Sequence, residues 1–208
     1  PITFPRIQGA DVCGEIVAVG AGVDPSRIGE RVITDGWLRD AEDPDDMNKT
    51  GYFGSERNGG FAQFTTTLSR NALAIQSDLS DAELATFSCS YSTAEGMLTR
   101  ANVTERDTVL VPGASGGVGG ALVQLAKRRG ARVIAMASET KHGEVAALGP
   151  DTLLPPAPAA LRAALGDEVD GTPDPSSCKA PSVAFAASVN SLTSPGAVSL
   201  RIVASWLI

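Results

Sequence analysis

Residues 111–120, VPGASGGVGG, restrict the fold of this chain more than any other segment, because five of these ten positions are glycine. An apolar stretch, TVLV, precedes them at 108–111, and apolar residues at helical spacing follow at 118–126. A second apolar stretch, ARVIAMA, begins at 131, within the length of a βαβ unit. Glycines let a backbone approach a pyrophosphate, and the free amides of a helix's first turn attract an anion. We therefore predict a dinucleotide phosphate turn between a strand and a helix.

The positions of the glycines match the dinucleotide-binding frame G-x-G-x-x-G with one departure. Ala114 stands where the first glycine is expected, and Gly116 and Gly119 fill the other two places. Gly116 would let the backbone approach the phosphates, and Gly119 would let the helix pack close to the strand. A turn that needs its glycines only for packing is the alternative. A Walker phosphate loop is excluded, because Gly120 and Ala121 stand where it requires Lys and then Ser or Thr.

The residues before the glycine stretch predict mainly β structure and then helices. Short apolar stretches alternate with glycines over 11–32, which is typical of strands and tight turns. Clustered acids, Pro44 and glycines over 35–60 predict a long surface loop, and a strand follows at 59–68. Ser80 and Glu83 form a capping-box pattern at the start of a helix. A second helix is expected over 93–99.

The alternation of predicted strands and helices continues after the glycine-led helix. Lys127, Arg128 and Arg129 lie in the last turn of the glycine-led helix, and Gly130 is placed to end it in the left-handed conformation. A further helix ends at Gly149, and a third short strand is expected at 151–154.

Composition excludes several classes of function. The net charge of -7 argues against binding nucleic acid or an anionic membrane surface, and no apolar run is long enough to span a bilayer. Three well-separated cysteines suit a reducing compartment, so we predict a soluble cytoplasmic protein. His142 is the only histidine, which removes most zinc sites and most catalytic triads.

Two motifs in the right order resemble the medium-chain dehydrogenase/reductase superfamily. VLVPGASGGVGGALVQLAKRRGARVIA resembles its cofactor-binding motif, and GADVCGEIVAVGAGVD with the later IGERV resembles its upstream barrel segment. The resemblance runs from about residue 5 to about 154. It implies an α/β fold with a partial GroES-like β-barrel, lacking its start, over 1–88. A partial Rossmann doubly wound parallel sheet over 89–170 would bind the cofactor.

The resemblance also places cofactor-binding residues and favours NADPH over NADH. The second strand of NAD sites usually ends with an acid that binds the ribose hydroxyls, whereas Ala137 and Ser138 stand here, with Lys141 soon after. An uncharged residue and a cation suit a 2'-phosphate, although Glu139 is close and Lys141 is equally a solvated helix residue. Thr93 matches a position that packs near the nicotinamide, or it caps its helix. The expected cofactor-binding residues are Thr93, Ala114, Ser115, Gly116, Gly117, Val118, Gly119, Ser138 and Lys141.

The same resemblance predicts that zinc is absent. Zinc alcohol dehydrogenases carry Gly-His-Glu where this chain has Gly9, Ala10 and Asp11, and four cysteines in the loop over 36–56, where this chain has none. Cys89 aligns with a catalytic ligand, but one thiolate does not hold zinc, so we interpret Cys89 as a buried small hydrophobe. This pattern is similar to the quinone oxidoreductase branch.

We therefore predict an oxidoreductase that transfers a hydride between NADPH and a small carbonyl, enone or quinone without catalytic zinc. The resemblance implies a homodimer, with a small molecule as the other partner. Catalytic residues are not assigned: Tyr91 and Asp11 are candidate acids, but a packing aromatic and a turn-forming acid are the favoured interpretations. The alternative is a non-catalytic nucleotide-binding protein or inactive remnant. That alternative draws on the absent metal ligand and on residues 171–208, where charged side chains become rare. A poorly specified tail, such as a shifted reading frame would produce, is expected there.

Overall fold

A computed structural model describes residues 3–157, 159–160 and 197–206. The chain divides into two compact units, Pro1–Cys89 with Phe185–Ile208, and Ser90–Ala184.

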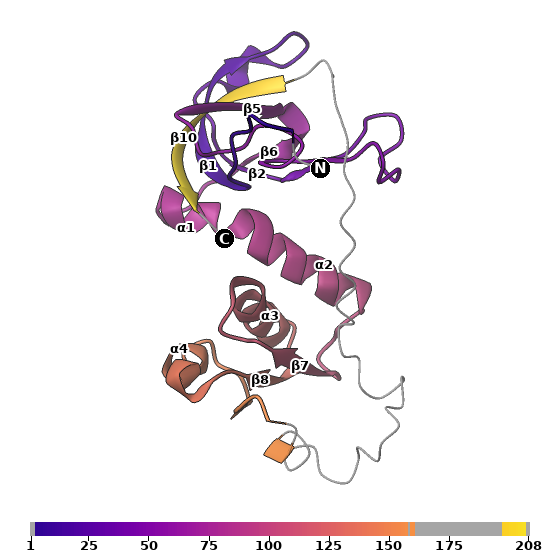
Figure 1. Cartoon of the computed structure of the whole chain (residues 1–208), viewed down its shortest axis with the longest axis vertical. Coiled ribbons are helices and arrows are strands. Elements are labelled where there is room, and N and C mark those ends of the chain that lie inside the picture. Colours follow the sequence, from indigo (N-terminus) through magenta and orange to yellow (C-terminus); the bar gives the residue numbers. More distant parts are fainter. Residues whose placement is uncertain (1–2, 158, 161–196, 207–208) are drawn as a thin grey trace. The chain divides into compact units, whose positions relative to one another are not determined.

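The first unit is built on a five-stranded antiparallel sheet in the order β5-β10-β1-β2-β6 (Figure 1). The strands are β1 (Asp11–Val19), β2 (Arg31–Thr34), β5 (Phe64–Leu68), β6 (Ala72–Ala74) and β10 (Ala197–Trp206). Val12, Cys13 and Ile16 of β1 are fully buried. Helix α1 (Asp81–Ala85) begins with the expected capping box, since Ser80 and Glu83 satisfy each other's backbone amides.

Two parts of this unit differ from the sequence prediction. The segment predicted as one long surface loop contains a small hairpin, β3 (Trp37–Leu38) paired with β4 (Gly51–Tyr52). The rings of Trp37 and Tyr52 form a T-shaped pair with centroids 5.3 Å apart, an aromatic pairing that no local pattern signals. The tail contains strand β10, which the sequence did not predict. The other residues of the predicted tail, 171–196 and 207–208, lie outside the described residues.

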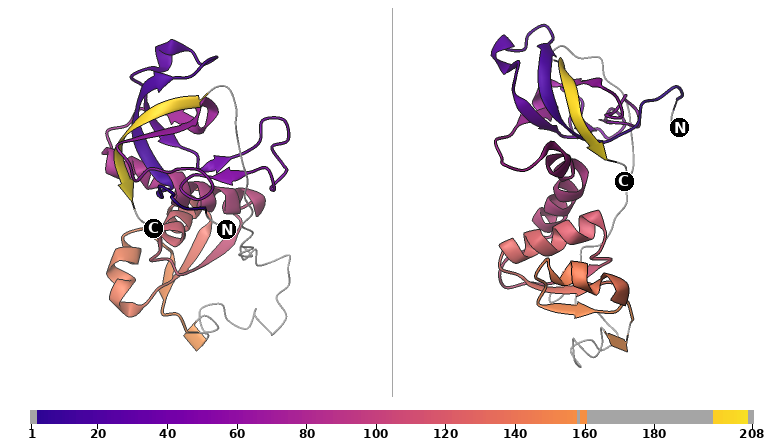
Figure 2. Two further views of the ribbon diagram at one scale, coloured as in Figure 1. Left: turned by 45° about the horizontal axis from the view of Figure 1, so that its top comes forward. Right: turned by 90° about the vertical axis from the view of Figure 1, so that its left-hand side faces the viewer.

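The second unit packs helices against a parallel sheet (Figure 2). Its strands are β7 (Thr108–Pro112), β8 (Arg132–Met136) and β9 (Thr152–Leu154), in the order β7-β8-β9. Its helices are α2 (Ser92–Arg100), α3 (Gly117–Arg128) and α4 (His142–Ala146). Pro112, Met136 and Leu154 lie opposite one another at the carboxyl edge of the sheet. The predicted βαβαβ order is confirmed.

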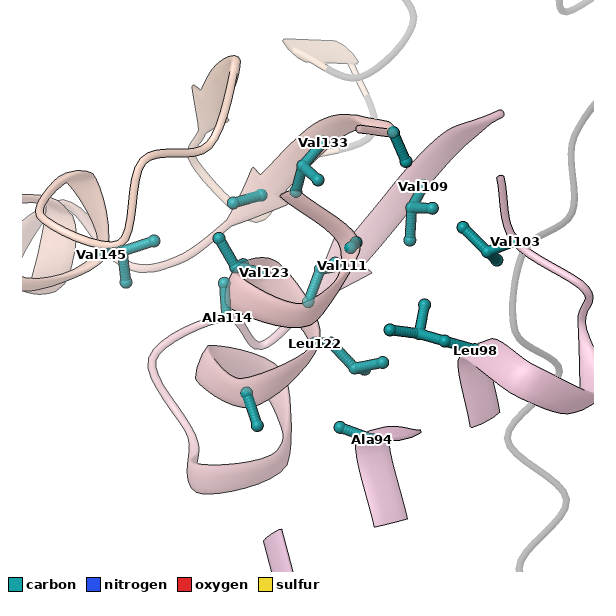
Figure 3. Packing of buried hydrophobic residues seen from close by; sticks show 14 of the residues in the cluster. Ala94, Leu98, Val103, Val109, Val111, Ala114, Leu122, Val123, Val133 and Val145 are labelled. Carbon is teal, nitrogen blue, oxygen red and sulfur yellow. The ribbon is translucent and has the colours of Figure 1, made fainter. Parts of the chain in front are cut away.

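One hydrophobic core holds the helices of this unit to its sheet (Figure 3). Leu98 of α2 and Leu122 of α3 point toward one another, and Val109 and Val111 of β7 face the same cluster. Each such side chain contributes about 1.5–3 kcal/mol when it is fully removed from water. Gly130 ends α3 with a φ of 82°, as predicted. The core therefore fixes where α3 begins relative to the ends of the strands.

Candidate functional site

The turn between β7 and α3 adopts the conformation that a phosphate site needs, with one change in the role of its glycines. Gly113 has a φ of 67°, a conformation that favours glycine, so it makes the tight turn. The amide of Gly116 donates to the Gly113 carbonyl at 3.0 Å, and the Ala114 amide donates to the Met136 carbonyl at 2.9 Å. Ala114 is buried and does not lie in the left-handed region. Alanine is therefore tolerated at position 114, because the left-handed conformation of the turn is adopted by Gly113.

The start of α3 presents backbone amides that are not satisfied within the helix. Gly116 is the N-cap and makes no side-chain capping bond. The first helical hydrogen bond runs from the Gly120 amide to the Gly116 carbonyl at 2.7 Å, so the amides of 117–119 precede the helical ladder. These amides and the helix dipole form a positive end suited to an anion.

Gly119 has the packing role that the sequence predicted for it. A Cβ there would lie 2.2 Å from the Gly113 carbonyl oxygen and 2.9 Å from the Ala114 Cα. Real Cβ atoms essentially never approach this closely, so any side chain at this position would push α3 away from the turn. Ser115, Gly116 and Gly117 are exposed and Val118 is half-buried, which leaves this face of the turn open to a ligand.

The end of β8 lies beside the same turn, because the Ala114 amide bonds the last residue of β8. Ser138 is exposed, with its hydroxyl oxygen 3.2 Å from that of Thr140. The Lys141 ammonium is exposed and pairs with Glu144 at 2.9 Å. An exposed pair of this kind is weak and readily exchanged for another partner. His142 is half-buried, with Nε2 2.9 Å from the Ala137 carbonyl oxygen.

The structure of helix α2 decides between the alternatives that the sequence left open for Thr93 as a helix cap and for Tyr91 as an acid or a packing aromatic. Thr93 is exposed in the first turn of α2, whose N-cap is Tyr91, so Thr93 does not cap the helix. The Tyr91 hydroxyl accepts a hydrogen bond from the Gln124 amide nitrogen of α3 at 2.8 Å. This contact supports the interpretation of Tyr91 as a helix-packing aromatic.

A polar cluster in the first unit joins three residues that are distant in the sequence. Asp11 is 3% exposed and accepts a hydrogen bond from the Cys89 amide at 2.8 Å. Burial raises the pKa of the Asp11 carboxyl, and the Cys89 amide opposes that rise. The Tyr52 hydroxyl donates to Cys89 Sγ at 3.4 Å. Desolvation raises the pKa of Tyr52 strongly, and the hydrogen bond to Cys89 adds to the rise.

These positions correct two sequence-based interpretations and add one residue. Asp11 is the buried first residue of β1 and not a turn-forming acid. Cys89 is half-buried and hydrogen-bonded rather than a fully buried hydrophobe. Tyr52 was not predicted as a candidate at all, because it belongs to the hairpin that the sequence analysis assigned to a loop.

The described part of the chain lacks a metal-binding cluster and a membrane-spanning helix. No group of three or more His, Cys, Asp or Glu side chains there could hold a metal ion. Among those residues, no helix is both long and apolar enough to cross a bilayer.

Comparisons with known proteins show which family the chain resembles. The model of the alcohol dehydrogenase GroES-like domain matches residues 1–77. A solved structure of an alcohol dehydrogenase from Sinorhizobium meliloti 1021 is similar, with 45% sequence identity and a TM-score of 0.70 over 78% of this chain and 46% of that chain. Over about three quarters of its length, the chain is therefore similar to alcohol dehydrogenases of the medium-chain dehydrogenase/reductase superfamily.

Further relatives include a reductase and an alcohol dehydrogenase solved with its cofactor. Acryloyl-coenzyme A reductase of Metallosphaera sedula is 33% identical over 150 residues, which are 68% of this chain and 45% of that protein. An E. coli CFT073 alcohol dehydrogenase complexed with NADH is 25% identical, with a TM-score of 0.70 over 78% of this chain and 51% of that chain. The chain spans about half the length of the curated relatives it matches.

The family match confirms the fold class predicted from the sequence, a GroES-like segment followed by part of a Rossmann sheet. It also shows that the relatives are oxidoreductases. The roles of individual cofactor-binding residues remain predictions.

Proposed function

We propose that this chain carries the nicotinamide-binding part of an oxidoreductase that transfers a hydride between NADPH and a small carbonyl, enone or quinone. The observation that carries the proposal is the uncapped start of α3, where the amides of 117–119 follow the Gly113 turn. When bound, the cofactor would supply the hydride, and the protein would supply its position and orientation.

The residues at the turn fit a dinucleotide. The amides of Gly117, Val118 and Gly119 would donate to pyrophosphate oxygens, and the open face at Ser115 and Gly116 would admit the ligand. Ala114 would hold the turn against the end of β8 through its amide. Thr93, exposed on α2, would lie on the nicotinamide side, in the role that the family resemblance gives it.

NADPH is proposed over NADH because of the residues that follow β8. Ser138 is uncharged and exposed where an NAD site would carry an acid, and Lys141 is held only by a surface pair with Glu144. A 2'-phosphate would draw Lys141 away from Glu144, since a charge-assisted bond to phosphate is stronger than an exposed ion pair.

A zinc-independent reaction is proposed from the residues at the family's metal position. Ala10 replaces the histidine ligand, and Cys89 Sγ accepts a hydrogen bond from Tyr52. Asp11 is occupied with the Cys89 amide, and Tyr91 with Gln124. We therefore leave the proton donor of the reaction unassigned.

Calorimetric titration of the purified chain with NADPH and with NADH tests the proposal. We expect saturable binding with NADPH preferred, and oxidation of NADPH by a member of a panel of enones, quinones and aldehydes. Binding without turnover would favour the alternative of a non-catalytic nucleotide-binding protein. A chain that is folded by circular dichroism but binds neither cofactor would contradict the proposal.

Lys141→Ala tests the preference for NADPH. Loss of a charged hydrogen bond costs about 1.5–3 kcal/mol, so NADPH affinity should fall at least about tenfold while NADH affinity stays unchanged. Lys49→Ala is the matched control, because Lys49 is an equally exposed lysine that pairs with Asp43 in the first unit. Equal loss for both cofactors would contradict the assignment of Lys141 to the 2'-phosphate.

A further inference from the structure

We propose that the Ser90 hydroxyl is a phosphate-binding group at the start of α3, and that Gly117 is glycine in order to leave room for it. The inference rests on the proposed function, because it adds a side-chain donor to the same turn. Ser90 was not among the residues predicted from the sequence.

A steric relation ties the two residues together. A Cβ on Gly117 would lie 2.7 Å from Ser90 Oγ and 3.5 Å from Ser90 Cβ. The first distance is too short for any real Cβ, whereas the second is ordinary contact. The hydroxyl oxygen therefore occupies the space where a side chain at the first position of α3 would begin.

The direction of that Cβ places the hydroxyl on the side of the open amides. In an α-helix every Cα–Cβ bond tilts toward the N-terminus, and the first-turn N–H groups point the same way. Ser90 Oγ consequently lies beside Gly117 toward the end of α3 that faces an anion. In the proposal it acts together with the backbone donors of Gly117 and Val118.

The surrounding packing fixes Ser90 in this place. The next residue, Tyr91, is bonded through its hydroxyl to Gln124, which lies seven residues after Gly117 on the same side of α3. Ala94 and Leu98 then bury α2 against the shared core (Figure 3). The segment from 90 to 98 thus runs along α3 with its start held against the helix N-terminus.

The Ser90 hydroxyl is available to a ligand. It is half-buried, and within the described residues no hydrogen-bond partner is found for it. A serine hydroxyl is one donor that rotates to suit its acceptor, and an anionic phosphate oxygen is a stronger acceptor than a neutral carbonyl. A pyrophosphate on the α3 amides would give this hydroxyl the acceptor that the protein does not.

Binding of three ligands to Ser90→Ala tests the inference. NADPH and ADP both carry a pyrophosphate group, whereas adenosine 2'-monophosphate carries only the phosphate assigned to Ser138 and Lys141. A hydrogen bond to a charged group is worth enough for a loss of about tenfold in affinity, so NADPH and ADP should both weaken by this factor. Adenosine 2'-monophosphate should bind unchanged. Thr99→Ala, which removes an exposed hydroxyl from the other end of α2, is the control and should leave all three affinities unchanged.

A double substitution separates the hydroxyl from the packing. Gly117→Ala should weaken ADP binding, since its methyl displaces Ser90 Oγ from its place. Ser90→Ala with Gly117→Ala removes that clash, because the remaining contact is ordinary, but should bind ADP no better than Ser90→Ala.

The outcomes distinguish this inference from the proposed function. If the unaltered chain binds neither NADPH nor ADP, the proposed function fails and this inference fails with it. If the unaltered chain binds both and Ser90→Ala binds them equally well, only the role of Ser90 is overturned.

Discussion

The turn over 113–119 in the second unit and the cluster of Asp11, Tyr52 and Cys89 in the first unit are assembled in opposite ways. The turn takes its conformation and its donors from consecutive residues and a strand beside it. The cluster joins residues that are 78 and 37 positions apart in the chain. A site made of consecutive residues is visible in one sequence, whereas a site made by folding appears only when its strands have been placed.

The largest effect that would test this contrast is expected from Gly119→Ala. A methyl group 2.2 Å from the Gly113 carbonyl oxygen cannot be accommodated without moving α3. Overpacking of this kind costs about 1–3 kcal/mol or more, and displacement of the helix should also abolish NADPH binding. Thermal unfolding and calorimetric titration would measure both losses.

Gly143→Ala is the control for that substitution. Gly143 lies in α4 with nothing within 4 Å of a Cβ, and alanine favours the helix by about 0.5–1 kcal/mol over glycine. Stability should therefore be unchanged or slightly higher. If Gly119→Ala behaved like Gly143→Ala, the close approach of α3 to the turn would be wrong.

The two cysteines of the first unit should differ in their reaction with iodoacetamide. Cys13 is fully buried and donates to Asp81 at 3.4 Å, and burial raises its pKa from 9.0 to about 11. Each pKa unit lowers the thiolate fraction tenfold, so at pH 8 Cys13 should react about a hundredfold more slowly than in the unfolded chain, before any effect of access. Cys89 is half-buried and should react first. Peptide mass spectrometry after timed labelling would show the order, and equal rates would contradict it.

Asp11→Ala and Asp11→Asn separate the hydrogen bond of the cluster from its charge. Alanine leaves the Cys89 amide without its acceptor, which costs about 1–3 kcal/mol for a buried donor. Asparagine keeps an acceptor oxygen and should be much less destabilising. Urea unfolding of the three proteins would measure the difference.

The pH dependence of the Asn variant has a definite sign. The pKa of Asp11 is raised by burial, so the unfolded chain ionises first as pH rises and the folded state loses stability relative to it. Asp11→Asn, which does not ionise at this position, should therefore be more stable relative to the unaltered chain at neutral pH than at pH 4. A stability difference that does not change over this range would argue against a raised pKa.

Much of the second unit was predictable because each element carries its own signal. The alternation of apolar stretches gave β7, α3, β8 and β9, and Gly130 marked the end of α3. The departure at Ala114 was visible, but its reason was not. The left-handed residue proved to be Gly113, one position earlier, and only the backbone angles show that.

The first unit was less predictable because its strands depend on distant partners. The hairpin of β3 and β4 has only two residues in each strand, too few for an alternating pattern. Strand β10 pairs with β1 and β5, nearly 200 and more than 100 positions away, so its surroundings are set by the sheet. Tyr52 was missed as a consequence, and Asp11 was assigned to a turn.

The smallest effect is expected from Tyr52→Phe, which removes one hydrogen bond from the cluster and leaves its packing in place. The donor contact to Cys89 Sγ is 3.4 Å long and to a weak acceptor, so stability should fall by no more than about 0.5–1 kcal/mol. The ring would keep its contact with Trp37, whose geometry does not involve the hydroxyl.

Trp37→Leu should cost more stability than Tyr52→Phe, since it removes an aromatic pair worth about 0.5–1.5 kcal/mol in addition to buried area. If Tyr52→Phe were the more damaging of the two, the hydroxyl would be the member that holds the hairpin to Cys89. The cluster would then be a polar network that depends on every member, in contrast to the turn of α3, whose conformation rests on backbone groups.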